Sequence, residues 1–341
     1  LETGLRQELY QWNHFRCDMI VEPVVYSSLV GGPTGSYADY GIQEQLNRAD
    51  DGLNVGYIPV IDNEADADRI VTPRVWYDRA ATEENYQSLC EIFDGIIPVK
   101  KRGIVHQWHS PWDQMIHWYG IERLFIDMYD RPGLVHRVLG NFTRALNEAL
   151  DRQEKEGMLD VGNGIWTVGS GGYGITDELP RENHAGHRVT AKEQWGCSTA
   201  QIFSGVSPEM HEEFALQYER KVLSRFGLTY YGCCEPLHKK VGILRSIKNL
   251  RKISMSPWIN LAEASETISG DYVFSFKPNP AHLAAVTFDP ELVRNYLKTV
   301  RAATRQNRCE WILKDITTVC NDPRRLDQWA AIAVAEALDI A

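Results

Sequence analysis

The chain has 341 residues, 43% of them hydrophobic and 24% charged, with a formal net charge of -10. This acidic balance argues against nucleic acid or an anionic membrane as a partner, because no basic stripe is present to displace counterions. No apolar run reaches membrane-spanning length, and the seven cysteines follow no disulfide framework. We therefore expect a cytoplasmic protein with reduced thiols.

Short β-rich runs alternate with longer helical runs along the chain, as they do in βαβ units. The clearest predicted strands are 18–25, 103–109, 228–234, 252–256, 272–276 and 311–316, with weaker candidates at 54–60, 165–168 and 199–203. This order predicts an α/β protein with a single (β/α)8 TIM barrel over residues 1–341, in which residues 1–100 form an N-terminal extension plus the first barrel elements. An open doubly wound sheet would produce the same local pattern.

The helices carry sharper signals than the strands. Residues 132–156 place apolar side chains three and four positions apart on one face, and Gly157 follows as a stop. A capping residue followed by a proline predicts three further helix starts, at Ser207, Asp289 and Asp322.

The glycine-rich run from Gly169 to Gly174 formally matches the dinucleotide-binding pattern. That pattern requires a helix whose N-terminus meets the pyrophosphate, and no amphipathic helix opens here. We interpret the run as a mobile loop whose backbone approaches a ligand. Asp177, in the same loop, is a candidate catalytic contact; its alternative role is that of a solvated surface acid.

Polar residues at the ends of predicted strands are candidate catalytic groups, because barrel enzymes place their chemistry there. His106 and His109 end one such strand, and either could manage protons. Lys277 ends another, where a charge is costly unless it is paired or used. The alternatives are a core histidine beside a surface one, and a salt bridge across the barrel mouth for Lys277.

The strongest motif comes directly off the predicted strand 228–234 and combines two adjacent thiols, a carboxylate and a nearby imidazole. Such a set suits zinc, provided that a distant strand adds another ligand. The predicted ligands are Cys233, Cys234, Glu235, His238 and Cys320. The alternative is that Cys233 and Cys234 are small buried hydrophobic residues.

The chain resembles the uroporphyrinogen decarboxylase superfamily from about residue 100 onward. The similarity lies in the stretch 118–132, the helix start at 206–214, the strand carrying Cys233, and the later turns 256–258 and 277–278. That superfamily includes cofactor-free decarboxylases and zinc-dependent methyltransferases that serve corrinoid proteins. The resemblance implies the barrel fold and makes a homodimer plausible.

Two departures from the superfamily pattern affect the expected reaction. The tetrapyrrole decarboxylases have an arginine-bearing N-terminal loop, whereas no arginine occurs here between Arg16 and Arg48. The methyltransferases carry a His-x-Cys pair, but the matching histidine position holds Tyr231 or Gly232. Porphyrinogen is therefore not expected as the substrate, and a zinc site would need a different ligand.

The resemblance implies a zinc-dependent methyltransferase that moves a methyl group between a small substrate and a separate corrinoid protein. Aromatic methyl ethers are candidate methyl donors, and the corrinoid would arrive on its partner because no carrier motif is present. One alternative is a metal-free decarboxylase or related lyase, with Lys277 or Arg188 as the cation for a substrate carboxylate. Another is a barrel that binds a ligand without catalysis.

Overall fold

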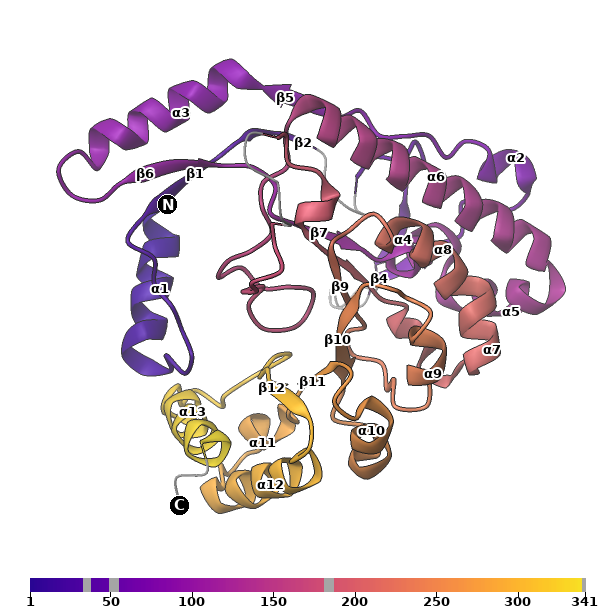
Figure 1. Cartoon of the computed structure of the whole chain (residues 1–341). Coiled ribbons are helices and arrows are strands. Elements are labelled where there is room, and N and C mark those ends of the chain that lie inside the picture. Colours follow the sequence, from indigo (N-terminus) through magenta and orange to yellow (C-terminus); the bar gives the residue numbers. More distant parts are fainter. Residues whose placement is uncertain (33–37, 49–54, 181–186, 339–341) are drawn as a thin grey trace.

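A parallel six-stranded sheet forms the centre of the fold, in the order β12-β11-β10-β9-β8-β7. The computed structural model describes residues 1–32, 38–48, 55–180 and 187–338. The strands of the sheet are β7 (His106–His109), β8 (Trp195–Ser198), β9 (Leu228–Tyr231), β10 (Leu250–Met255), β11 (Val273–Phe276) and β12 (Arg308–Trp311). Figure 1 shows the sheet at the centre of the molecule, with helices α4 to α10 to one side. The parallel α/β arrangement confirms the predicted class.

The strands of the first hundred or so residues form short two-stranded sheets. The parallel pair is β1 (Val25–Ser28) with β6 (Val99–Arg102), and the antiparallel pairs are β2 (Val30–Gly32) with β5 (Trp76–Asp78) and β3 (Gln45–Arg48) with β4 (Val55–Ile58). The helices of this part are α1 (Glu2–His14), α2 (Glu64–Ala67) and α3 (Arg79–Ile92).

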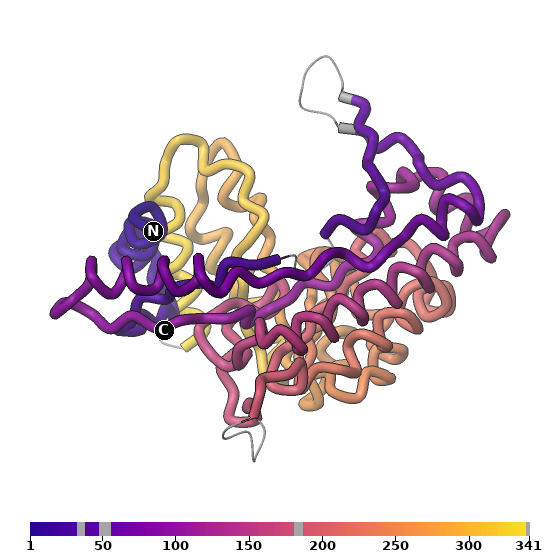
Figure 2. The backbone as a smooth tube through the Cα atoms, turned by 90° about the horizontal axis from the view of Figure 1, so that it is seen from above, coloured from indigo at the N-terminus to yellow at the C-terminus, as the bar shows by residue number. Residues whose placement is uncertain are grey.

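The hydrogen-bonded strands do not close an eight-stranded barrel within the described residues. The central sheet ends at β7 and β12, while β1 and β6 pair only with each other. Helix α1 instead lies beside the C-terminal helix α13 (Arg324–Ala337), where His14 Nδ1 is 3.5 Å from Asp327 Oδ1 (Figures 1 and 2). The closed barrel and the single-domain assignment for residues 1–341 therefore stay predictions.

The helices after β7 follow the sequence signals closely. They are α4 (Pro111–Tyr119), α5 (Ile121–Asp130), α6 (Pro132–Glu156), α7 (Pro208–His211), α8 (Gln217–Leu223), α9 (Val241–Leu244), α10 (Leu261–Ile268), α11 (Ala281–Ala284) and α12 (Pro290–Ala303). A π-helical turn over Glu212–Leu216 joins α7 to α8. Gly157 ends α6 in the left-handed conformation, and Ser207 and Asp289 cap α7 and α12 as predicted. Among the described residues, no helix combines the length and apolarity that a membrane crossing needs.

Several predicted strands were misplaced. Residues 18–24 are irregular, 165–168 make only one bridge, and 201–205 form a 3-10 helix. The last strand is 308–311 instead of 311–316, and Asp315, beyond its end, takes a left-handed conformation with φ 58°. The weak candidate 54–60 contains β4, although Asn54 lies outside the described residues.

The two faces of the central sheet differ in polarity. Tyr231, Ile253 and Phe274 pack in an apolar core on the helix-covered face. On the opposite, inner face, Lys252 pairs with Glu310 at 2.9 Å. A buried ion pair costs desolvation energy that apolar packing would not. The inner face also carries the apolar cluster of Trp195, Cys197 and Tyr230, so charged and apolar side chains lie together on it.

Candidate active site

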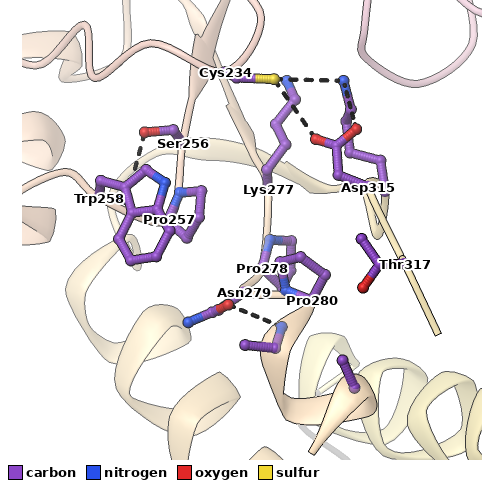
Figure 3. A pocket seen from close by; sticks show the side chains of 13 residues that line it. Cys234, Ser256, Pro257, Trp258, Lys277, Pro278, Asn279, Pro280, Asp315 and Thr317 are labelled. Atoms are coloured by element: carbon purple, nitrogen blue, oxygen red, sulfur yellow. Dashed lines mark hydrogen bonds and ion pairs between the residues drawn. The ribbon is translucent and has the colours of Figure 1, made fainter. Parts of the chain in front are cut away.

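A cavity of about 320 Å³ opens at the carboxyl ends of β10, β11 and β12. This is the end of a parallel α/β sheet where ligands bind. Trp258, which is 70% exposed, stands on its wall (Figure 3). The lining residues are Cys234, Ser256, Pro257, Trp258, Lys277, Pro278, Asn279, Pro280, Ala281, Ala284, Lys314, Asp315 and Thr317.

Two thiols and an ammonium group meet at one edge of the cavity. The Sγ atoms of Cys233 and Cys234 are 3.4 Å apart, and Lys314 Nζ lies 3.4 Å from the first and 3.9 Å from the second. Asp315 Oδ2 is 3.6 Å from Cys234 Sγ, a contact visible in Figure 3. The loops after β9 and β12 thus bring together residues about eighty positions apart in the sequence.

The close contacts shift the pKa values of Cys233 and Cys234 in opposite directions. The hydrogen bond with Cys234 and then the charge of Lys314 lower the pKa of Cys233 to about 7, against the opposing effect of burial. The same thiol–thiol hydrogen bond, together with burial, raises the pKa of Cys234 well above its ordinary value. Burial lowers the pKa of Lys314, but the two cysteines and Asp315 outweigh it and the net shift is upward. Lys314 is therefore a cation at neutral pH, and Cys234 keeps its proton.

Lys277 enters the cavity from the end of β11, as the sequence predicted for a strand terminus. Its Nζ donates hydrogen bonds to the hydroxyl of Tyr230 and, at 3.1 Å each, to the carbonyl and hydroxyl oxygens of Ser275. Only 4% of Lys277 is exposed, and burial lowers its pKa from 10.5 to about 7. A substantial fraction of this side chain is therefore the neutral amine near pH 7.

The glycine-rich run packs on Tyr230, and its close backbone approach is to this ring. A Cβ atom added at Gly169 or Gly171 would lie 2.5 Å from ring carbons of Tyr230. Gly172 donates its N–H to Glu310 Oε1 at 3.2 Å. Contact with the inner face of the sheet thus explains these three glycines, and the approach of the loop to a ligand stays a prediction.

Glu235 holds the turn after β9 and does not join the thiols as a ligand. Its carboxylate is fully buried, accepting hydrogen bonds from Thr199 Oγ1 at 2.7 Å and from the backbone N–H of Cys233 at 2.8 Å. Gly232, with φ 99°, allows the chain to turn there. Glu235 therefore positions Cys233 through the backbone.

The remaining predicted zinc ligands lie apart from the thiols. His238 faces α10, where its Nε2 is 3.8 Å from Glu263 Oε2, and the Sγ of Cys320 contacts the carbonyls of Ala284 and Ala285. Across the described ranges, no three His, Cys, Asp or Glu side chains form a group that could hold a metal ion. Zinc needs at least three protein ligands at an open catalytic site.

The donor set therefore does not fit zinc, and the reason is chemical as well as geometric. The ammonium of Lys314 already provides the positive charge beside the sulfur atoms of Cys233 and Cys234. A divalent ion at the same place would have to displace that ammonium or share the space with it at a large electrostatic cost.

The two histidines of β7 point to opposite faces of the sheet, as strand alternation predicted. His106 lies on the inner face, 3.0 Å from Cys197 Sγ, and burial lowers its pKa to about 4. His109 is buried on the helix-covered face against Phe226, and burial lowers its pKa to about 3. Neither histidine lines the cavity.

Two further candidates lie away from the cavity. Asp177 is exposed, and its neighbour Glu178 pairs with Arg251 at the amino end of β10, opposite the cavity. Arg188 donates hydrogen bonds to the carbonyls that end α6. The sequence pointed to the strand-end run that begins at Tyr230 and to Lys314 near the end of the last predicted strand, but it assigned neither residue a role. Lys314 follows the apolar run 311–313, and this could have indicated a strand-end charge.

Comparisons with known proteins leave the family of the chain unassigned. No family model matches the sequence, and no curated protein matches it either. A solved structure to which the chain is similar is a methyltransferase from Methanosarcina mazei, with 10% sequence identity, coverage of 86% of this chain and 76% of that chain, and a TM-score of 0.48. At these values the likeness shows nothing about the reaction of this chain.

Proposed function

We propose that the chain is a metal-independent enzyme of the decarboxylase or lyase type, which binds a small carboxylate in the cavity and cleaves the adjacent carbon–carbon bond. The observation that carries this proposal is that Lys277 and Lys314 both line the same cavity. A metal-free decarboxylase needs a cation for the substrate carboxylate and a group that accepts the electron pair of the broken bond.

Lys314 is the group that would bind the carboxylate. Its Nζ lies 3.6 Å from Asp315 Oδ1, so this position already accommodates a carboxylate. The side chain of Asp315 is 57% exposed and can turn into solvent when a substrate carboxylate takes its place. An ammonium group at a partly enclosed wall holds an anion more strongly than one in bulk water.

Cys234 would supply the proton that the product carbon needs after cleavage. Its thiol lines the cavity, and its raised pKa keeps the proton on sulfur at neutral pH. Because its pKa is raised, the thiol is a weak acid and would donate only to a strongly basic carbon formed beside it.

The test is binding and turnover with two defined probes, acetoacetate and malonate, in the presence of a chelator. We expect calorimetric binding of at least one probe and carbon dioxide release from acetoacetate, both lost in Lys314→Met. Lys298→Met is the matched control, because Lys298 is exposed on α12 and does not line the cavity. Dependence on added zinc, or binding that is unchanged in Lys314→Met, would contradict the proposal.

Methyl transfer between a small substrate and a separate corrinoid protein is the second candidate function. The observation in its favour is the lowered pKa of Cys233 beside Lys314, because a thiolate is a good methyl acceptor. Its test is the intact mass of the protein after incubation with aromatic methyl ethers. Addition of one methyl group to Cys233 or Cys234 would favour this function over decarboxylation.

A further inference from the structure

In the part of the chain that the structure describes, Lys277 donates to no carboxylate, although a buried lysine normally does. Within the described residues, the hydrogen-bond partners of its Nζ are neutral oxygens, on Tyr230 and Ser275. Burying an ammonium group among neutral partners is costly, so the protein stabilises the uncharged amine. An uncharged amine on a cavity wall is a nucleophile.

We infer that Lys277 forms a Schiff base with the ketone of a 3-oxo acid bound in the cavity. This inference rests on the proposed function and names its substrate class. The carboxylate of such an acid would lie at Lys314, and its ketone carbon, two bonds away, would face Lys277 on the adjoining strand. The imine is the electron acceptor that a metal-free decarboxylation requires.

The covalent steps consume one proton in total, and the water released when the imine forms is taken up again when it is hydrolysed. The Lys277 amine attacks the ketone carbon, the carbonyl oxygen takes up protons and leaves as water, and a protonated imine remains. The bond to the carboxylate then breaks, carbon dioxide leaves, and the electron pair moves into the imine to give an enamine. Protonation at carbon and addition of water release the ketone and restore the amine of Lys277.

Tyr230 is placed to move the protons of imine formation. Its hydroxyl contacts Lys277 Nζ and lies 3.0 Å from Ser275 Oγ and 3.3 Å from Ser170 Oγ. Burial raises the pKa of Tyr230, so the phenol stays protonated and can donate to the departing oxygen. The packing of Gly169 and Gly171 on the ring holds this hydroxyl in position.

A second buried lysine gives an internal control. Burial also lowers the pKa of Lys240, to about 8, but its Nζ donates to the carbonyl of Phe203 and it does not line the cavity. A reaction governed by acidity alone would label both lysines, whereas a reaction governed by the cavity labels Lys277.

The experiment is reductive trapping of the full chain with acetoacetate and sodium borohydride, in the presence of a chelator. Borohydride reduces an imine to a stable secondary amine, which is detected by intact mass and located by peptide mapping. We expect one adduct per chain, on the peptide that contains Lys277. It should be absent from Lys277→Arg and from Lys277→Met, and present at the wild-type level in Lys240→Arg.

The outcomes separate this inference from the proposed function. Binding of malonate that depends on Lys314, with no borohydride adduct or with an adduct on another lysine of the wild-type chain, overturns the Schiff base and leaves the carboxylate site intact. Failure of both probes to bind overturns both proposals. Mapping on the wild-type chain decides between these outcomes even where the Lys277 variants do not fold.

Discussion

The Nζ atom of Lys314 lies 3.4 Å from the Sγ atom of Cys233, so an ammonium group occupies the place beside the thiols that the family resemblance implied for zinc. The fixed charge of the lysine stabilises a thiolate without any metal. It comes from the loop that follows β12, whereas Cys233 follows β9. Lys314 and Cys233 therefore lie together because of the order of the strands in the sheet.

Substitution of Lys314 by Met should raise the pKa of Cys233, because the stabilising charge is removed. A rise of one pKa unit from about 7 would reduce the thiolate fraction at pH 7, and with it the rate of alkylation, roughly fivefold. The measurement is the pH dependence of iodoacetamide labelling, with Cys233 identified by peptide mapping. Lys298→Met should label at the wild-type rate. Equal labelling rates of Cys233 in Lys314→Met and Lys298→Met would show that Lys314 does not lower the pKa of this thiol.

Reductive trapping at Lys277 should increase with pH through about 7 and then level off, because burial lowers the pKa of this lysine to about 7 and the neutral amine is the reactive form. A solvent-exposed lysine would continue to gain reactivity up to its ordinary pKa of about 10.4. The check is adduct yield against pH at a short fixed time. A yield that still rises steeply well above pH 7 would show that Lys277 is not perturbed.

Metal removal should leave the protein unchanged in stability and in carboxylate binding. The donors that the sequence indicated do not form a three-ligand group in the described part of the chain. Elemental analysis of untagged protein should find zinc well below one ion per chain, equally so in Cys233→Ser and Cys234→Ser. About one zinc ion per chain in the wild type, lost in either cysteine variant, would contradict this prediction and support a metal site at the thiols.

The free energy of unfolding should depend on pH through the buried carboxyl group of Glu219, which contacts Tyr231. Burial raises the pKa of Glu219 from 4.5 to about 7, and Tyr231 donates a hydrogen bond of 2.6 Å to it. The folded state therefore holds its proton more tightly than the unfolded state, so this stabilisation is complete below pH 4.5 and is lost as pH rises through about 7.

Glu219→Gln should flatten that pH dependence, since the amide cannot ionise. Relative to wild type, the variant should gain about 1 kcal/mol or more between about pH 5 and pH 8. The measurement is chemical denaturation at both pH values, and Glu213→Gln serves as the exposed control on the same helical segment. Identical slopes in wild type and Glu219→Gln would contradict the assignment.

The features that were predicted correctly depend on residues close together in the sequence. Helix α6 follows from apolar residues at helical spacing and from Gly157, whose left-handed conformation ends it. The start of α12 follows from the Asp289 cap and the proline after it. The placement of Lys277 at a strand end beside a cavity was also predicted, because parallel strands present their carboxyl ends at one edge.

The composition of the site depended on contacts that no local pattern encodes. Glu235 stands next to the thiols in sequence, yet its carboxylate turns away to Thr199. His109 ends a strand but faces the helices. Successive side chains of a strand point to opposite faces, so only every second residue of β7 faces inward.

The amino-acid order thus specified elements, caps and the end of the sheet where chemistry belongs, all of which act over a few residues. The partner of Cys233 was decided by the tertiary structure, since three parallel pairings, from β9 through β10 and β11 to β12, bring Lys314 beside it. Each pairing adds a register that depends on packing across the whole sheet. The sequence predicted a metal ion beside Cys233, and only the folded chain shows that the ammonium group of Lys314 lies there.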